Sequence, residues 1–118
     1  MFDEEKIKMM KEKLEKEFCE MMERGEDVKH FLYFPMEILT EKVKDGLDRI
    51  LCETAWAQIE IGKINEYSFI AYEDDLITIS FDELDKQLDF LNHLIDFYEE
   101  KEEYEKCARI KEILNKKI

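Results

Sequence analysis

The chain has few of the residues that interrupt regular structure, with three glycines and one proline in 118 residues. This shortage favours long helices joined by short connections. No run approaches the roughly 18–20 apolar residues of a membrane-spanning helix. Residues 1–27 are charged throughout and lack the apolar stretch of a secretory signal. We therefore expect no membrane association and a cytoplasmic location.

Cysteine is also scarce. An odd, widely spaced set of three, Cys19, Cys52 and Cys107, does not form a disulfide framework. No CxxC pair or local Cys/His cluster indicates structural zinc. The three thiols are interpreted as small core residues of a protein in a reducing compartment. We expect no metal site and no cofactor.

Basic residues are outnumbered, because 18 Lys and Arg stand against 31 Asp and Glu, for a net charge of −13. This balance argues against direct binding of nucleic acid by neutralising phosphates, and against docking on anionic membranes. The chain is too short for a large multidomain enzyme, so residues 1–118 are expected to form a single domain. With 45% hydrophobic residues it can still fill a core.

The negative charge is concentrated in one part of the chain. Residues 73–105 hold 13 acidic and 2 basic residues, a net charge of −11, whereas residues 106–118 hold 1 acidic and 5 basic residues, a net charge of +4. Two interpretations stay open. The acids either form a solvated face that keeps the protein soluble or a docking surface for a partner with a basic surface.

Apolar periodicity predicts a predominantly helical α+β domain. Helices are expected at Asp3–Arg24, Thr40–Ile61, about 81–100 and about 103–116, an extended segment at Val28–Phe34, and a β-hairpin from Tyr67–Tyr72 and Leu76–Ser80. The order is α-β-α-β-β-α-α, with a small antiparallel sheet. Residues 80–118 form a C-terminal helical hairpin.

Local signals predict several helix ends. Gly25 and Gly62 are suited to end the first two helices, and Ser80 with Glu83 reads as a capping box before the third. Gly46 lies inside the second helix, where it lowers helix stability by about 1 kcal/mol relative to Ala. No glycine or proline separates the last two helices, so one continuous helix through about residue 115 stays open.

The third helix carries two apolar stripes. The first has the a/d spacing of a coiled coil and comprises Leu84, Leu88, Leu91, Ile95 and Tyr98. The second comprises Phe90, Leu94 and Phe97. Together they cover more than the apolar face of an ordinary surface helix. Either both stripes are buried in the monomer, or the second one binds a partner or a second copy of the chain.

The opposite face of the third helix is acidic and carries one histidine. It comprises Asp85, Asp89, His93, Asp96 and Glu100. His93 lies four residues after Asp89 and three before Asp96, so the three side chains share one face and could hold a metal. The favoured interpretation is a solvated face, because one face of one helix rarely supplies a complete metal site.

The last helix resembles a known family. An aromatic-Glu pattern followed by small and aliphatic residues is carried by Tyr104, Glu105, Ala108, Ile110 and Ile113. Residues 88–115 are thereby similar to the UVR motif, a short antiparallel helical hairpin of excision-repair proteins and Clp-protease adaptors. The chain departs from that pattern at Cys107 and at Lys111-Glu112. The resemblance implies protein–protein association through the hairpin and no catalysis.

No catalytic motif is present. The sequence lacks a Gly-rich phosphate loop, HExxH, G-x-S-x-G and EF-hand spacing. We expect a non-enzymatic adaptor or regulator that binds another protein, or forms a homodimer, through its last two helices. The alternative is an acidic inhibitor that mimics nucleic acid and occupies the groove of a nucleic-acid-binding protein, for which a phage origin would fit.

Overall fold

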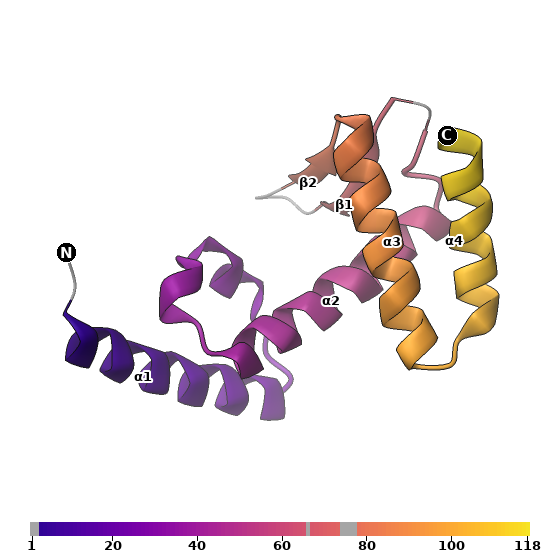
Figure 1. The fold of residues 1–118 in the computed structure, drawn as a ribbon. Coiled ribbons are helices and arrows are strands. Elements are labelled where there is room, and N and C mark those ends of the chain that lie inside the picture. Colours follow the sequence, from indigo (N-terminus) through magenta and orange to yellow (C-terminus); the bar gives the residue numbers. More distant parts are fainter. Residues whose placement is uncertain (1–2, 66, 74–77) are drawn as a thin grey trace. The chain divides into compact units, whose positions relative to one another are not determined.

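The computed structural model describes residues 3–65, 67–73 and 78–118, apart from the Lys29 side chain. The described residues form four α-helices, two short 3₁₀-helices and two strands (Figure 1). In chain order these are α1 (Glu4–Glu23), η1 (Lys29–Tyr33), η2 (Met36–Ile38), α2 (Glu41–Glu60), β1 (Phe69–Glu73), β2 (Thr78–Phe81), α3 (Leu84–Glu100) and α4 (Tyr104–Lys117). The predominantly helical α+β class is confirmed.

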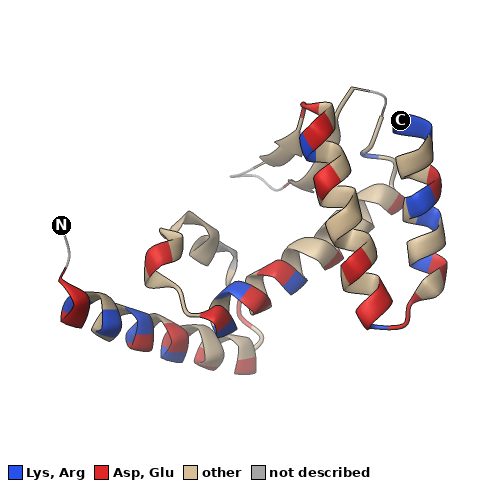
Figure 2. Ribbon diagram, in the orientation of Figure 1, with Lys and Arg blue, Asp and Glu red and all other residues tan. Residues whose placement is uncertain are grey.

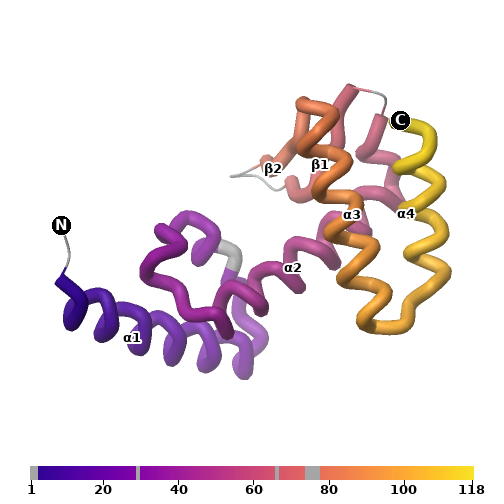
Figure 3. Tube along the Cα trace, in the orientation of Figure 1, coloured from indigo at the N-terminus to yellow at the C-terminus, as the bar shows by residue number. Residues whose placement is uncertain are grey.

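The chain divides into two compact units, Met1–Ile50 and Leu51–Ile118. The division falls inside α2, which is a continuous helix at this point (Figure 3). The sequence indicated one domain because the chain has only 118 residues. Each unit has its own apolar core.

In the N-terminal unit, local signals set both ends of α1. Asp3 caps its start, where the carboxylate accepts a hydrogen bond of 2.8 Å from the Lys6 N–H. At its end Gly25 adopts a positive φ of 70°, and the Glu26 N–H donates to the Met21 carbonyl. This is the Schellman arrangement, which glycine adopts without a steric penalty.

The segment Val28–Phe34 is not the strand that the sequence predicted. Residues Lys29–Tyr33 form the 3₁₀-helix η1. Val28, Phe31 and Phe34 lie three residues apart, so they share one face of a helix with three residues per turn. Phe31 is fully buried and meets the ring of Phe18 edge-on at 5.3 Å. Burial of Val28 and Phe31 on this face outweighed the strand propensity of the segment.

In the C-terminal unit, α3 and α4 form the expected antiparallel hairpin. The chain reverses at Glu102, which has φ 59°, and the Glu103 N–H donates to the Tyr98 carbonyl over 2.9 Å. The alternative of one continuous helix is thereby excluded. Because a glutamate and not a glycine adopts the left-handed conformation here, the sequence contained no glycine from which this turn could be predicted.

The β-hairpin is confirmed as an antiparallel pair. Phe69 pairs with Phe81 and Glu73 with Thr78, and a bulge lies between Ile70 and Tyr72. The bulge allows two consecutive residues, Ala71 and Tyr72, to be buried. The expected turn residues Asp74 and Asp75, and residues 76 and 77 of the second predicted strand, lie outside the described residues.

The predicted capping box is wrong. Ser80 lies in β2 and pairs with Ile70, so it cannot cap a helix. Helix α3 begins at Leu84, after an N-cap Glu83 that makes no side-chain capping hydrogen bond. Pairing in the sheet keeps the backbone extended through Phe81, so the helix begins about one turn later than predicted.

The core of this unit lies between the hairpin, the strands and the second half of α2. Buried residues come from α2, β1, α3 and α4, and β2 adds the partly buried Ile79 and Phe81. The fully buried residues include Cys52, Ala55, Phe69, Leu91, Leu94, Tyr98 and Ile110. The hairpin is thus positioned by its apolar face, which leaves its opposite face exposed.

Candidate functional site

Four acids form a stripe along the exposed face of α3. Asp85, Asp89, Asp96 and Glu100 are all exposed, and α3 carries acidic residues along its length (Figure 2). Successive residues of a helix turn by 100° and rise 1.5 Å, so the four lie within about 60° of arc and span about 22 Å. We call these four residues the acidic stripe.

Other acids of the hairpin are neutralised by lysines. Glu99 pairs with Lys111 across the hairpin at 3.7 Å, and Glu103 pairs with Lys106 at 3.1 Å. No ion pair reaches a member of the acidic stripe in residues 3–65, 67–73 and 78–118. The stripe therefore presents uncompensated negative charge at neutral pH.

The described residues do not bring Asp89, His93 and Asp96 together as a metal site. Their ligand atoms do not gather within 4.8 Å of one another. His93 instead approaches Cys52, whose sulfur lies within 4.8 Å of a ring nitrogen of His93. Cys52 is fully buried, so its thiol is closed to an external substrate.

The second apolar stripe of α3 is largely part of the core. Leu94 is fully buried, so it cannot contact a partner as the sequence suggested. Phe90 is half-buried and stacks on Phe81 with 4.9 Å between ring centroids. Phe97 is also half-buried and carries the Lys101 ammonium 4.9 Å from its ring centroid. Only these two aromatic edges reach the surface.

The UVR-like residues of α4 divide between core and surface. Ile110 is fully buried and Ile113 is half-buried. Tyr104 is 63% exposed, and Glu105 and Ala108 are exposed as well. The aliphatic positions of the motif thus hold the hairpin together, and the others leave an open face on α4.

A pocket lies at the open end of the hairpin, opposite the Lys101–Glu103 turn. It has a volume of about 660 Å³ and is open on one side. Its described lining comes from the segment before β1, the start of α3 and the end of α4, and comprises Ile64, Asn65, Tyr67, Asp82, Leu84, Gln87, Ile113, Lys116 and Lys117. We call it the hairpin pocket.

One wall of the hairpin pocket is held by a buried glutamine. Gln87 is 1% exposed. Its amide nitrogen donates to the carbonyls of Tyr67 at 3.0 Å and Phe81 at 2.9 Å, and its oxygen accepts from the Lys117 ammonium. Lys117 also donates to the Asn65 carbonyl at 2.7 Å. These bonds connect α3, α4 and the segment before β1, so the pocket wall is preformed.

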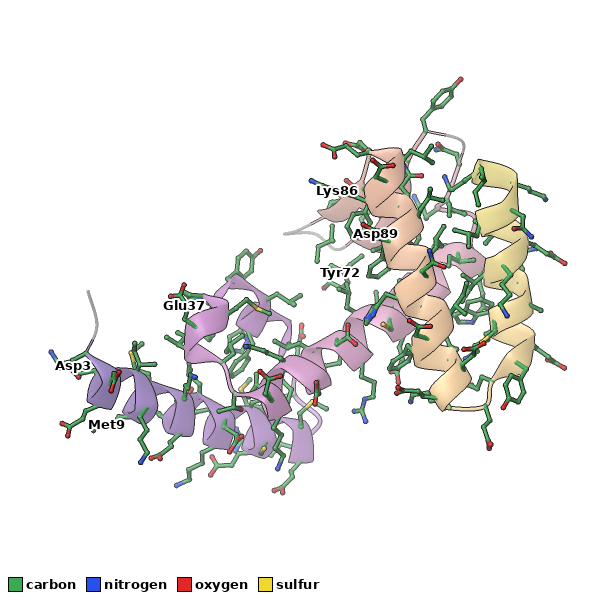
Figure 4. The ribbon with its side chains drawn as sticks, viewed as in Figure 1. Asp3, Met9, Glu37, Tyr72, Lys86 and Asp89 are labelled. Atoms are coloured by element: carbon green, nitrogen blue, oxygen red, sulfur yellow. The ribbon has the colours of Figure 1, made fainter. Side chains whose placement is uncertain are left out.

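Sequence reasoning missed the hairpin pocket. Its lining residues are separated by up to 53 positions, and none belongs to a recognisable motif. One signal was available in the sequence. The first turn of α3 carries an apolar residue, Leu84, and an uncharged amide, Gln87, and both are unusual on a turn that faces only solvent. Lys86 and Asp89 on the same part of α3 point away to solvent (Figure 4).

Comparison of the chain with protein-family models, with curated proteins and with solved structures gives no match. Among the described residues, no helix has both the length and the apolar character required to cross a membrane. The candidate sites are therefore defined by geometry alone. They are one charged surface and one pocket on the same hairpin.

Proposed function

We propose that this protein is an interaction module that binds a partner protein with a basic surface, through the acidic stripe of α3. One observation carries the proposal. The four acids of the stripe are exposed on one helical face and have no ion-pair partner in the described part of the chain, whereas Glu99 and Glu103 nearby are paired.

Such a stripe has an energetic reason to bind. Like charges on neighbouring helix turns repel one another and lower the stability of the free protein slightly. Lysine and arginine side chains of a partner would replace this repulsion with attraction. Complementary potentials also steer the two proteins together and raise the association rate at low ionic strength.

The aromatic edge of α3 adds an apolar contact beside the charge. Phe97 is half-buried and lies about 90° around the helix from the middle of the stripe. A basic partner that covers the stripe would reach this ring, which already holds the Lys101 ammonium over its face. Cation–π contact makes the ring suitable for a second cation from the partner.

The role that fits this surface is a non-enzymatic adaptor or regulator. Three free cysteines are present, and we propose a reducing compartment such as the cytosol, where free thiols persist. The UVR-like hairpin supports the same role, because in that family the hairpin serves protein association. Homodimer formation through the hairpin stays a prediction.

The proposal is tested by parallel affinity capture from the native host with two matched variants. The first carries Asp85→Asn, Asp89→Asn, Asp96→Asn and Glu100→Gln. The control neutralises four exposed acids of α1, namely Glu5, Glu12, Glu17 and Glu23, each to Gln. Both variants change the net charge by the same amount.

We expect the wild type and the α1 control to retain a common basic protein that the stripe variant loses. Purified, that complex should weaken steeply as salt rises, because its contacts are solvent-exposed charges. Equal capture by all three chains, or a complex that ignores salt, would remove the acidic stripe as the contact.

A further inference from the structure

The two edges of the β-hairpin differ in what covers them. On the outer side of β1, the Ile70 N–H donates to the Lys63 carbonyl over 3.0 Å, and Ile64 forms an antiparallel bridge with Phe69. On the outer side of β2, no third strand joins the sheet among the described residues. The chain itself therefore closes one edge of the pair and leaves the other open.

The closed edge shows which main-chain groups of β2 point outward. In an antiparallel pair, two residues directly opposite each other either exchange both hydrogen bonds or turn their N–H and C=O groups away from each other. The Ile70 N–H points to Lys63, away from β2, and Ser80 is the residue opposite Ile70. The N–H and C=O of Ser80 therefore point outward. Those of Thr78, two residues earlier, do the same, because the direction alternates along a strand.

The residues of this open edge do not block pairing. Proteins usually protect an exposed edge with lysine, proline or an inward-pointing charge, and β2 contains none of these. Its exposed side chains, those of Thr78 and Ser80, are small and uncharged, so an approaching main chain meets no large group. Outward main-chain groups at such an edge are a template for a further strand.

The two faces of β2 determine which side chains a further strand can carry. Ile79 and Phe81 are half-buried, and Phe81 stacks on Phe90 of α3 with 4.9 Å between ring centroids. Phe90 is half-buried as well, so apolar side chains of an added strand would extend this cluster. Thr78 and Ser80 lie on the opposite, exposed face. A strand that alternates apolar and polar residues therefore fits the edge.

Charge distinguishes a second copy of this chain from a different protein. The chain has a net charge of −13, and residues 73–105 hold 13 acidic and 2 basic residues. Pairing of β2 with β2 of another copy would bring these like charges together, whereas a basic segment would be attracted. Asp82, which directly follows β2, is exposed and extends the negative potential to the end of the strand.

We propose that the open edge of β2 binds an extended, basic segment of a partner protein as a third strand. Main-chain hydrogen bonds to Thr78 and Ser80 hold the segment, and its apolar residues lie beside Phe81 and Phe90. This is a second surface with a mode of recognition different from that of the acidic stripe. It rests on the proposed function only in that the partner is basic.

The experiment follows amide hydrogen exchange of the full ¹⁵N-labelled chain by NMR. The probe is the peptide acetyl-Lys-Val-Lys-Val-Lys-Val-Lys-amide. In the free protein the amides of Thr78 and Ser80 should exchange faster than that of Phe81, which faces β1. Saturation with the peptide should slow the first two at least about tenfold more than the third, because only they gain a hydrogen bond.

Two matched peptides separate main-chain pairing from simple attraction of charge. The first is the same peptide with every main-chain nitrogen methylated, which keeps the side chains and the charge but donates no main-chain hydrogen bond. It should bind at least about tenfold more weakly. The second replaces every lysine by glutamate and should show no binding, because the edge lies in a field of negative charge.

Two variants of one residue test the edge from the side of the protein. Ser80→Pro removes the outward N–H, at a position where a strand tolerates proline because that N–H does not pair with β1. It should weaken binding of the peptide at least about tenfold. Ser80→Ala loses the same hydroxyl but keeps the N–H, so its affinity should stay within about twofold of wild type. Thermal melting checks that both variants fold, and the exchange experiment on wild type decides if Ser80→Pro does not.

Each contrary result overturns the proposal. Equal binding of the peptide and its N-methylated form removes main-chain recognition. Protection of Thr78 and Ser80 that rises with protein concentration alone assigns the edge to a second copy. The variant that neutralises the acidic stripe should bind the peptide more weakly but protect the same two amides, whereas loss of that protection would assign the peptide to the stripe. Failure of one proposal is thereby distinguishable from failure of the other.

Discussion

The ring of Phe18 on α1 occupies the space beside the α-carbon of Gly46 on α2. A Cβ at position 46 would lie 2.7 Å from Cζ and 2.8 Å from Cε1 of that ring, well inside normal carbon–carbon contact. Phe18 is only 4% exposed, so its ring has little room to move. Gly46 is a helix-weakening residue by sequence, yet it allows α1 and the first half of α2 to pack closely.

We expect Gly46→Ala to lower the free energy of unfolding by about 1 kcal/mol. Overpacking of a core costs about 1–3 kcal/mol, and the better helix propensity of alanine returns up to about 1 kcal/mol. Urea denaturation measures the change. In a Phe18→Leu background the same substitution should become stabilising, and a loss of equal size there would show that the ring is not the cause.

Glu102→Gly should stabilise the protein by about 1 kcal/mol. Glu102 has φ 59° at the end of α3, where a side chain with a Cβ is disfavoured by about 1–2 kcal/mol and glycine is not. Thermal or urea unfolding measures the gain. Glu102→Ala removes the same charge but keeps the Cβ, so it should give no comparable gain. If alanine stabilises as much as glycine, relief of charge repulsion is the source.

We expect Glu83→Ser to stabilise α3, and urea denaturation measures the gain. Glu83 is the N-cap residue and makes no capping hydrogen bond, whereas a serine hydroxyl at this position contributes about 0.5–1 kcal/mol. Ser80→Ala is the matched control, because Ser80 is an exposed strand residue whose loss should change stability by less than about 0.5 kcal/mol. If Ser80→Ala instead lowers the free energy of unfolding by about 1 kcal/mol, Ser80 acts as a helix cap as the sequence predicted.

The stability of the protein should fall at alkaline pH in a way that depends on Tyr98. Burial, reinforced by the nearby Cys52 and Glu103, raises the pKa of the Tyr98 phenol well above its ordinary value near 10. Above about pH 10 the unfolded chain releases this proton while the folded chain keeps it, so the free energy of unfolding decreases with pH.

Tyr98→Phe removes that ionisation together with the 3.4 Å hydrogen bond from the phenol to the Cys52 carbonyl. Wild type should be the more stable protein at pH 8, by about 1 kcal/mol for one hydrogen bond. The difference should shrink as the pH rises from about 9 to 11. If the free energies of unfolding of the two proteins fall in parallel as the pH rises, folding does not raise the pKa of Tyr98.

Much of the fold could be predicted because the signals for it are local. Gly25 and Gly62 mark helix ends through hydrogen bonds to residues a few positions away, and the structure confirms both. The apolar period of each long helix needs only its own residues. The acidic stripe was predictable for the same reason, because four acids on one helix share a face whatever surrounds them.

The failures fall where distant residues compete with local preference. Val28–Phe34 has strand-forming residues, but burial of Phe31 against Phe18 favoured a 3₁₀-helix. Ser80 has the residue type of a cap, but pairing with Ile70 placed it in the sheet. In each case the deciding contact lies at least ten residues away in the sequence, beyond the reach of a local pattern.

The sequence by itself determined the helical class, most helix ends, and the concentration of negative charge on the third helix, since all of these depend on neighbours within a few turns. Only the tertiary structure decided which acids are paired across the hairpin and that Leu94 is buried. It also decided that Tyr67, Leu84, Ile113 and two lysines meet around one pocket. That meeting depends on how α3, α4 and the segment before β1 share a core, and burial of apolar surface between distant segments leaves no local pattern.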